Sequence, residues 1–319
     1  MSKVLQKIIE YKRAVIGTTV SLISGAIIFK KILKPAYAKA RTEFDYGTAM
    51  IPHIDKRYKD GEDACYANKD FLVVLDGVGG WNEVGVDPGL FTKQLIKLIE
   101  GEFYRDQYQS LKDMLDNSLK QTTNKGSSTA VMLQIDPKEP RQIRTINLGD
   151  SGYAIFRFDK ATYYNQGSNS INIDDLSLQY RSKEQQHGYD FPFQCGTNGD
   201  PASDAVEQVH QMQHNDIIVV GSDGLLDNMY DKDIKTCIRQ YLNHEGKSAI
   251  GKDLDVKQAA TCLAAKAEQM SNDVNNFSPF ANAAKQAGKE HTTGGKPDDI
   301  TVIVAQFKNK QRRFRKYVD

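Results

Sequence analysis

Cysteine is scarce and widely spaced in this sequence. The 319 residues include four cysteines, Cys65, Cys195, Cys237 and Cys262, and no two of them form a CxxC pair. Zinc sites and disulfide frameworks are usually recognised by closely spaced cysteines. The spacing therefore argues against both kinds of site, and it fits a protein of a reducing compartment.

A basic stripe is missing from most of the chain. Residues 1–41 hold nine of the 42 basic residues and one of the 41 acidic residues, which leaves 33 basic against 40 acidic residues in the rest. An acidic body gives no support for nucleic-acid binding, so we expect no nucleic-acid partner. No internal repeat of fixed period is visible, and a composition of 39% hydrophobic and 26% charged residues is ordinary for a globular domain.

Long uncharged runs are absent except for one near the N-terminus. Residues 14–29 carry no charge and have a basic pair on each side. As a helix this run spans about 24 Å, slightly less than the roughly 30 Å of a bilayer core. Three interpretations stay open, namely a membrane anchor, a mitochondrial presequence and a secretory signal cleaved near residues 36–38. We favour an uncleaved anchor, and we predict a basic, apolar anchor or targeting segment over 1–41 and a folded domain over 42–319.

The folded part is organised around a strand that ends in an acid. Residues 71–75 (FLVVL) are five consecutive apolar residues, which predicts a strand buried on both faces, and Asp76 follows with three glycines among the next four residues. Such a carboxylate lies beside backbone that can approach a ligand closely. Just upstream, Glu62 and Asp63 form a second acidic pair across a predicted hairpin.

Two later stretches repeat this arrangement. Residues 216–223 read as an apolar strand that ends in Asp223, and Asp298 and Asp299 open the last apolar strand. Buried carboxylates of like charge repel one another and would cost several kcal/mol without cations. Acids at the ends of several core strands therefore predict an oxygen-ligated divalent metal site.

The rest of the chain alternates strands with pairs of helices. Hydrophobic spacing predicts strands in 130–135, 143–156 and 299–307, and helices in 88–99, 107–120, 234–241 and 256–270. Residues 158–180 predict a polar surface loop, and 271–297 predict a polar connection. Residues 181–198 are compatible with a flap over the site and with ordinary loop packing. The pattern predicts an α+β fold in which helices cover a sheet core.

Six short motifs connect these acids in a fixed order. They are residues 61–64 (GEDA), 76–81 (DGVGGW), 126–130 (GSSTA), 147–152 (NLGDSG), 222–228 (SDGLLDN) and 297–301 (PDDIT). In this order they resemble the metal-dependent PPM (type 2C) Ser/Thr protein phosphatases. Within that family the chain looks most similar to the mitochondrial branch, on residues 85–88 (GVDP), 184–187 (EQQH), 278–281 (SPFA) and 294–301 (GGKPDDIT). The resemblance covers about residues 45–307, and six ordered motifs are far more specific than any single one.

The resemblance implies a fold and a first group of metal ligands. Two antiparallel sheets should pack face to face as a central β-sandwich with helices outside, and the anchor would add an N-terminal membrane helix. Asp76 should bridge two Mg²⁺ or Mn²⁺ ions, with the Gly77 carbonyl as a further ligand. Glu62 should hold one ion, directly or through water, with Asp63 supporting it.

The resemblance also implies a second group of ligands and a reaction. Asp223 and Asp298 should hold the other ion, and Asp150 together with Asp223 should hold a weaker third one. Two divalent ions lower the pKa of a shared water toward about 7, and the resulting hydroxide attacks phosphorus in line. Asp76, Asp223 and Asp298 are therefore the predicted catalytic acids.

Two positions differ from many members of this family. Val78 stands where they carry a histidine proposed to protonate the leaving oxygen, and Tyr58 stands where they carry an arginine four residues before the acidic pair. Nearby Lys56 and Arg57 are candidates for binding the substrate phosphate by charge. The mitochondrial branch resembles this chain at both positions, so they do not indicate a loss of activity. Val78 also argues against a haloacid-dehalogenase-type phosphatase, which needs a second aspartate there.

Together these features predict a phosphoserine/phosphothreonine phosphatase that acts on a phosphoprotein and is tethered to the mitochondrial inner membrane by residues 14–29. The alternative is a PPM-fold structural subunit of a larger mitochondrial membrane complex with little or no activity. His53 and His187 are expected to pack or to form hydrogen bonds rather than to catalyse. Trp81 is expected to be a core or flap aromatic residue.

Overall fold

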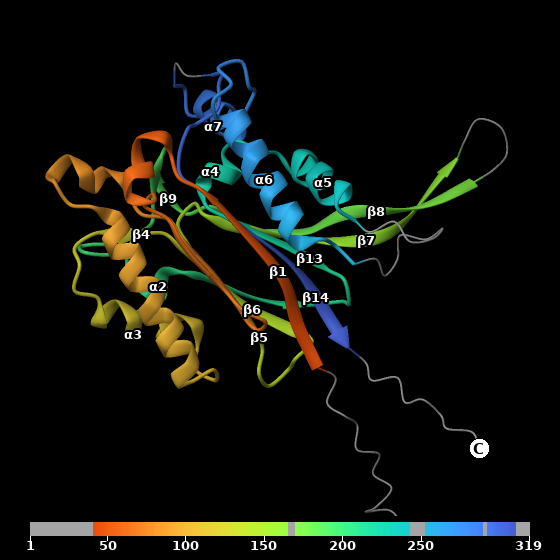
Figure 1. Ribbon diagram of the computed structural model, residues 1–319, viewed down its shortest axis with the longest axis horizontal. Coiled ribbons are helices and arrows are strands. Elements are labelled where there is room, and N and C mark those ends of the chain that lie inside the picture. The colour runs from red at the N-terminus through yellow and green to blue at the C-terminus, as the bar shows by residue number, and fades with distance from the viewer. Residues whose placement is uncertain (1–40, 165–169, 243–252, 290–291, 311–319) are drawn as a thin grey trace, which may run out of the picture. The chain divides into compact units, whose positions relative to one another are not determined.

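The structure is a computed structural model that describes residues 41–164, 170–242, 253–289 and 292–310 (Figure 1). The predicted apolar run at 14–29 lies outside the described residues. In the part of the chain that is described, no helix combines the length and the hydrophobicity needed to cross a bilayer. The membrane helix of the predicted fold class therefore has no support here.

Within the described residues, the chain forms two five-stranded antiparallel sheets with the orders β1-β14-β13-β7-β8 (sheet A) and β12-β6-β5-β3-β2 (sheet B). The strands of sheet A are β1 (Arg41–Ile51), β14 (Ile300–Lys310), β13 (Ile217–Gly221), β7 (Gly152–Tyr164) and β8 (Ser170–Arg181). The strands of sheet B are β12 (Val206–Gln211), β6 (Gln142–Leu148), β5 (Ala130–Ile135), β3 (Phe71–Leu75) and β2 (Ala64–Ala67). Two short pairs join β9 (Gln186–Gly188) to β10 (Phe191–Pro192) and β4 (Ser127–Ser128) to β11 (Cys195–Gly196).

Helices cover the outer face of each sheet (Figure 1). Sheet B packs against α2 (Pro88–Arg105) and α3 (Leu111–Gln121). Sheet A packs against α4 (Asp223–Leu226), α5 (Asp231–Gln240) and α6 (Val256–Ser271). The connections contain α7 (Pro279–Gln286) and the 3₁₀ helices η1 (Ile54–Lys59), η2 (Gly79–Val84) and η3 (Ala202–Asp204).

Apolar clusters hold these layers together. The cluster between the two sheets contains Leu72 and Val74 of β3 together with Phe44 of β1. Phe71 and Val73 point the other way, into the cluster that joins sheet B to α2 and α3. This alternation explains why β3 is apolar at every position. The predicted sandwich of two antiparallel sheets with helices outside is confirmed.

Two predicted connections contain regular structure instead. β7 and β8 pair from Ala154 opposite Arg181 to Tyr164 opposite Ser170, so the predicted loop at 158–180 is largely a β-ribbon. A ribbon is held by backbone hydrogen bonds and does not require an apolar face along its whole length. The predicted connection at 271–297 contains α7, which begins where the Ser278 Oγ accepts a hydrogen bond from the Ala281 N–H.

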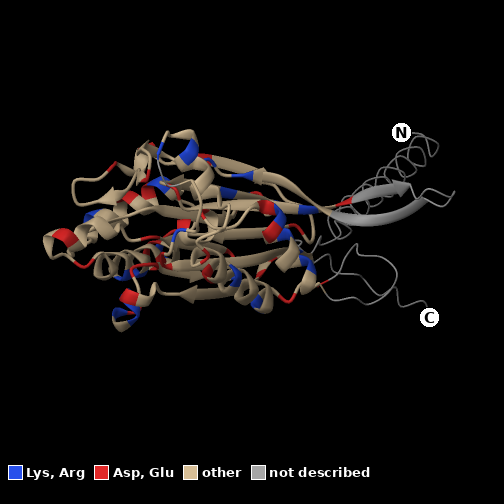
Figure 2. Cartoon of the chain, turned by 90° about the horizontal axis from the view of Figure 1, so that it is seen from above, with Lys and Arg blue, Asp and Glu red and all other residues tan. Residues whose placement is uncertain are grey.

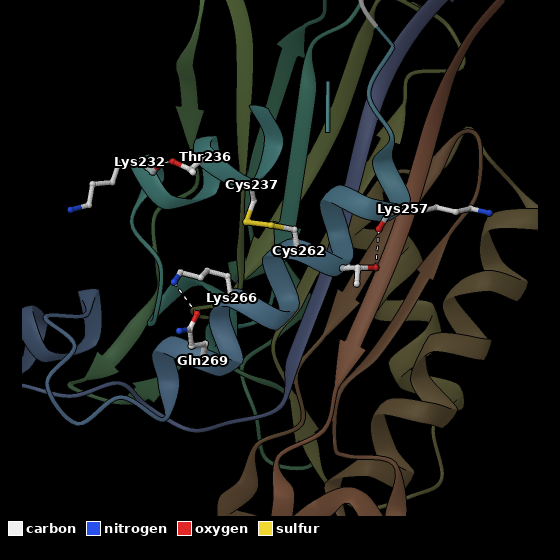
Figure 3. The surroundings of a disulfide bond; sticks show 8 residues. Lys232, Thr236, Cys237, Lys257, Cys262, Lys266 and Gln269 are labelled. Carbon is white, nitrogen blue, oxygen red and sulfur yellow. Dashed lines mark hydrogen bonds between the residues drawn. A yellow bond between two sulfur atoms is a disulfide. The ribbon is translucent and has the colours of Figure 1, made fainter. Parts of the chain in front are cut away.

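The cysteine spacing argued against a disulfide framework, but the structure contains one disulfide. Cys237 in α5 and Cys262 in α6 are joined by a disulfide, with their Cα atoms 5.9 Å apart (Figure 3). The two residues are 25 positions apart in the sequence, but α5 and α6 are neighbours on sheet A. Tertiary packing rather than local spacing brings the sulfur atoms together, while Cys65 and Cys195 are free.

Candidate metal centre

Acidic and basic residues are interspersed along the chain over the body of the protein (Figure 2), but several acids gather in one pocket. The acidic pocket has a volume of about 210 Å³, and its lining includes the predicted ligands Asp76, Gly77, Asp150, Asp223 and Asp298. Asp76 and Gly77 follow β3, and Asp150 lies between β6 and β7. Asp223 follows β13, and Asp298 precedes β14. Because adjacent antiparallel strands begin and end at the same edge of a sheet, the fold brings these segments to one end of the sandwich.

The backbone that carries Asp76 is fixed on both sides. The Asp76 carbonyl accepts a hydrogen bond from the Thr129 N–H at 2.9 Å, and the Val78 N–H donates to the Ser127 carbonyl at 3.0 Å. A Cβ atom at Gly77 would lie 2.6 Å from the Glu62 carbonyl oxygen, so only glycine fits between them. The glycine after Asp76 is therefore required by close packing of two backbone segments.

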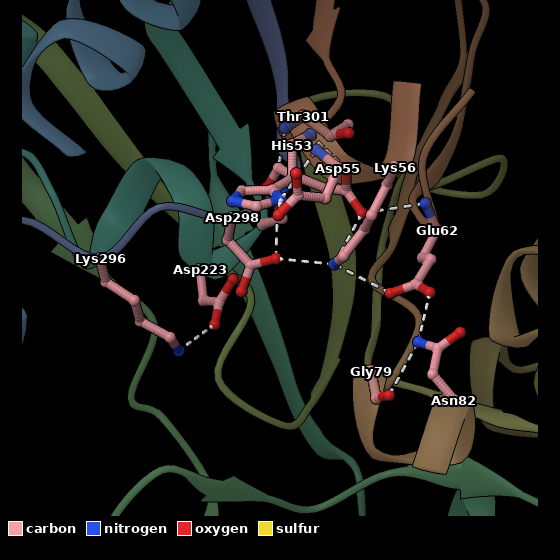
Figure 4. Close-up of polar contacts among 12 residues, drawn as sticks. His53, Asp55, Lys56, Glu62, Gly79, Asn82, Asp223, Lys296, Asp298 and Thr301 are labelled. Carbon is pink, nitrogen blue, oxygen red and sulfur yellow. Dashed lines mark hydrogen bonds and ion pairs between the residues drawn. The ribbon is translucent and has the colours of Figure 1, made fainter. Parts of the chain in front are cut away.

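Glu62 lies beside the acidic pocket, fully buried and bound by basic side chains (Figure 4). Its carboxylate oxygens are 2.8 Å from the Lys56 Nζ and 2.7 Å from the Lys59 Nζ, and the Asn82 side-chain amide donates to it at 2.7 Å. Burial alone raises the pKa of Glu62, but these hydrogen bonds outweigh burial and lower that pKa below its usual value. Glu62 is therefore held as a carboxylate.

Asp63 does not line the acidic pocket. It is buried, and burial, followed by the charge of Asp299, raises the pKa of Asp63 well above its usual value. Asp299, rather than Asp63, contacts the Glu62 backbone, since its carboxylate accepts the Glu62 N–H at 2.9 Å and the His53 N–H at 2.7 Å. The position of Asp299 directly after Asp298 is the sequence signal that could have identified it.

Two lysines contact the acids of the pocket (Figure 4). The Lys56 Nζ lies 3.1 Å from Asp298, and the Lys296 Nζ lies 2.7 Å from Asp223 and 3.1 Å from Asp227. Burial lowers the pKa of both lysines, but the surrounding carboxylates outweigh burial and raise the pKa. Lys296 was not among the predicted site residues, although it stands two residues before Asp298 in the motif 294–301.

Arg57 does not reach the acidic pocket. Its Nη2 pairs with Glu268 at 2.7 Å, and its Nε donates to the Pro52 carbonyl. Of the two residues predicted to bind phosphate, the structure brings only Lys56 to the acids. His187 forms its hydrogen bond with Asp200, outside this pocket.

The two lysines balance only part of the negative charge. Among the described residues, no basic side chain forms an ion pair with Asp76 or Asp150. Burial, followed by the charges of Asp63 and Asp223, raises the pKa of Asp76 well above its usual value. Burial and then Asp223 raise the pKa of Asp150 to about 8. Additional positive charge is needed before all of these carboxylates can be ionised at neutral pH.

The donors of the acidic pocket fit divalent cations. Carboxylate and carbonyl oxygens are the ligands that Mg²⁺ and Mn²⁺ prefer in proteins. The Asp223 Oδ1 is buried and has no hydrogen-bond partner among the described residues, and Asp76 is one of the groups that act on the pKa of Asp223. Within the described chain, no group of three or more His, Cys, Asp or Glu side chains is arranged so that it could hold a metal ion. The fit therefore rests on the oxygen donors and the unbalanced charge, and binding of ions would require Lys56 and Lys296 to give up part of their ion pairs.

Known proteins of similar sequence are named as phosphatases. No family model matches the chain. Over 266 residues it is 34% identical to a probable protein phosphatase 2C 80 of Arabidopsis thaliana, covering 81% of this chain and 57% of that protein. It is 31% identical to a protein phosphatase PTC7 homolog of Xenopus laevis, covering 77% of this chain and 80% of that protein.

A solved structure agrees with these relatives. The X-ray structure of the photosystem II phosphatase PBCP is 29% identical in sequence, with a TM-score of 0.70, and the match covers 84% of this chain and all of that one. The chain spans little more than half the length of the Arabidopsis relative but most of the Xenopus one.

Proposed function

Since the chain belongs to the protein phosphatase 2C (PPM) family of metal-dependent phosphatases, we propose that it hydrolyses phosphoserine and phosphothreonine in proteins. The observation that carries this proposal is the acidic pocket, where Asp76 and Asp150 face Asp223 and Asp298 with too few basic partners. Buried acids arranged in this way are costly for folding, so their presence at one site favours a functional role.

Each acid has a proposed task. Asp76, at the centre, would hold two divalent ions, with the Gly77 carbonyl beside it. Glu62 would complete one ion's ligands, and Asp223 and Asp298 those of the other. When bound, Mg²⁺ or Mn²⁺ ions lower the pKa of water toward about 7 and so supply hydroxide at neutral pH. The acids themselves would fix where the ions lie relative to the substrate.

Three other residues of the pocket also bear on the proposed reaction. The Lys56 ammonium group lines the pocket and would bind phosphate oxygens through charge-assisted hydrogen bonds. Asp150 would hold a third, weaker ion together with Asp223. Val78 lines the pocket and has no proton to donate, so the proton for the leaving serine oxygen comes from water or from another group.

The proposal is tested by replacing the central acid. Asp76→Asn should lower Mn²⁺-dependent hydrolysis of an aryl phosphate by at least about a hundredfold, since the several kcal/mol that the ions contribute are lost. It should also weaken Mn²⁺ binding in a calorimetric titration. The control is Asp116→Asn, which removes a surface acid of α3 paired with Lys120. Unchanged turnover in Asp76→Asn would contradict the proposal.

We further propose that the enzyme is mitochondrial and tethered to the inner membrane by residues 14–29. The support is the apolar run itself and the motifs shared with the mitochondrial branch of the family. The test is fractionation of mitochondria that express the full chain or a chain without residues 1–40. The full chain should remain with the membranes after alkaline extraction, and the truncated chain should not.

A second candidate is a PPM-fold structural subunit of a mitochondrial membrane complex, with little or no activity. The observation in its favour is that the Lys56 Nζ already contacts Glu62 and Asp298, and the Lys296 Nζ already contacts Asp223. If these ion pairs are permanent, the wild-type protein should bind no Mn²⁺ at millimolar concentration and should purify with partners in fixed proportion. Metal-dependent turnover by the isolated chain would exclude it.

A further inference from the structure

A second pocket opens beside the acidic pocket. It has a volume of about 430 Å³, and Val78 and Gly80 line both pockets, so the two adjoin each other along residues 78–80. Pockets of roughly 300–1,000 Å³ are of the size that commonly binds ligands. The tasks proposed for the acids make no use of this second pocket.

Hydrogen bonds connect the two walls of the second pocket. Trp81 stands on the η2 wall, and Gln194 and Asp200 stand on the opposite wall. The Trp81 Nε1–H donates to the Ser127 Oγ at 2.6 Å, and this hydroxyl donates to the Gln194 Oε1 at 2.5 Å. The Gln194 N–H in turn donates to the Asp200 carboxylate at 2.8 Å. The pocket is therefore a built feature of the fold and not a gap between loops.

An aromatic stack forms part of the opposite wall. The His187 ring lies 4.0 Å from the ring of Phe193 at an interplanar angle of 8°, and 5.3 Å from the ring of Phe191. Phe193 packs against the apolar cluster under α2 and α3, which anchors the stack to the core. The His187 Nε2 lies 3.0 Å from Asp200, so the imidazole is held from its edge as well.

The second pocket presents apolar surface to solvent. Phe191 is 53% exposed and Val84, on the η2 wall, is 70% exposed, so neither contributes much to the core. Both oxygens of Asp200 already contact His187 and the Gln194 N–H. The pocket therefore offers exposed apolar groups and an acid that is already occupied, which suits an apolar ligand better than a charged one.

We propose that the second pocket binds an apolar or aromatic side chain that flanks the phosphorylated residue of the protein substrate. This inference rests on the proposed phosphatase function. A phosphate bound by Lys56 in the acidic pocket requires the neighbouring residues of the substrate to leave that pocket, and Val78 and Gly80 line both pockets. An extended chain advances about 3.3–3.6 Å per residue, so residues close to the phosphoserine in sequence can reach the adjoining pocket.

The test compares phosphoserine peptides that differ only beside the phosphoserine. In one set the flanking positions carry leucine, on the N-terminal or the C-terminal side, and in the matched set they carry serine. The wild-type kcat/KM should be about tenfold higher for one leucine peptide, because a hydrophobic pocket discriminates by roughly 10–200-fold. Phe191→Ser should remove most of this preference, and Val84→Ser on the other wall should reduce it.

The controls separate this pocket from the chemistry and from the fold. Hydrolysis of a small aryl phosphate, which has no flanking residues, should be unchanged in both variants. Phe277→Ser replaces a phenylalanine that is equally exposed, at 53%, and lines neither pocket, so it should keep the preference for leucine. Equal kcat/KM for leucine and serine peptides, or a preference that survives both pocket variants, overturns the inference and leaves the phosphatase function standing. Failure to hydrolyse any phosphopeptide overturns both.

Discussion

The two ends of the sandwich hold their buried acids in opposite ways, and a single strand shows the difference. β13 is preceded by Asp216 and followed, after one residue, by Asp223. Asp216 is 1% exposed, and its carboxylate receives the Nε and Nη2 of Arg157 at 2.7 and 2.6 Å. The Gln213 N–H also donates to it, at 2.7 Å. This acid is fully satisfied by one arginine and the local backbone.

At the other end of the same strand, Asp223 is only half satisfied. One of its oxygens, Oδ2, pairs with Lys296, while Oδ1 has no hydrogen-bond partner among the described residues. Burial raises the pKa of Asp223, but Lys296 outweighs burial and lowers it, whereas the pKa of Asp76 is raised by burial and by its acidic neighbours. A structural acid comes with its own cation, whereas an acid kept for a ligand shares too few cations with its neighbours.

The largest expected effect concerns the structural end. Asp216→Asn removes the ion-pair partner of the half-buried Arg157 guanidinium group, which should lower the free energy of unfolding by about 3–5 kcal/mol. Equilibrium denaturation in urea measures this. Turnover of the folded variant at low temperature should remain near that of the wild type, because Asp216 lies at the end of the sandwich opposite the acidic pocket. A variant of unchanged stability but low activity would contradict a purely structural role for Asp216.

A smaller effect is expected in the helical layer, away from both ends. Replacing Cys237 or Cys262 with serine opens the disulfide between α5 and α6, whose closed loop of about 25 residues should contribute about 3 kcal/mol of stability. Urea denaturation measures this loss, and turnover should be unchanged. Cys65→Ser, at a free cysteine, is the matched control. Four reactive thiols in the oxidised, denatured wild-type protein, instead of two, would contradict the pairing.

The sequence predicted that Asp76, Asp150, Asp223 and Asp298 come together because the motif that carries each acid is short and can be recognised by itself. Each acid stands at the end of an apolar strand, and antiparallel strands share their edges, so the fold class alone brings the acids together. The direction of individual side chains was not accessible in the same way. Lys56 and Arg57 are adjacent in η1, where successive residues point about 120° apart, so one reaches the acids and the other reaches Glu268.

Features that depend on partners distant in sequence escaped prediction. The disulfide joins two helices whose neighbourhood only the tertiary fold defines. In the ribbon of β7 and β8, polar residues interrupt the alternation of polar and apolar residues by which a half-buried strand is recognised. The ribbon tolerates this because backbone hydrogen bonds hold its two strands together without an apolar face along their whole length. α7 was not predicted because it is short and lies within a polar stretch, although Ser278 before Pro279 is a recognisable helix start.

The smallest effect tests the comparison most directly, because its sign should be opposite to that of Asp216→Asn. In EDTA, Asp76→Asn should be about 1 kcal/mol more stable than the wild type. The raised pKa of Asp76 means that this acid takes up a proton when the protein folds at neutral pH, which costs free energy, whereas asparagine needs no proton. Added Mn²⁺ should stabilise the wild type, because a ligand that binds only the folded state raises the free energy of unfolding, and should stabilise the variant much less. Thermal denaturation of both proteins with and without Mn²⁺ measures the two differences. If Asp76→Asn instead loses stability in EDTA as Asp216→Asn does, the acids of the pocket are an ordinary ion-pair network completed by Lys56 and Lys296, and the two ends of the sandwich do not differ in kind.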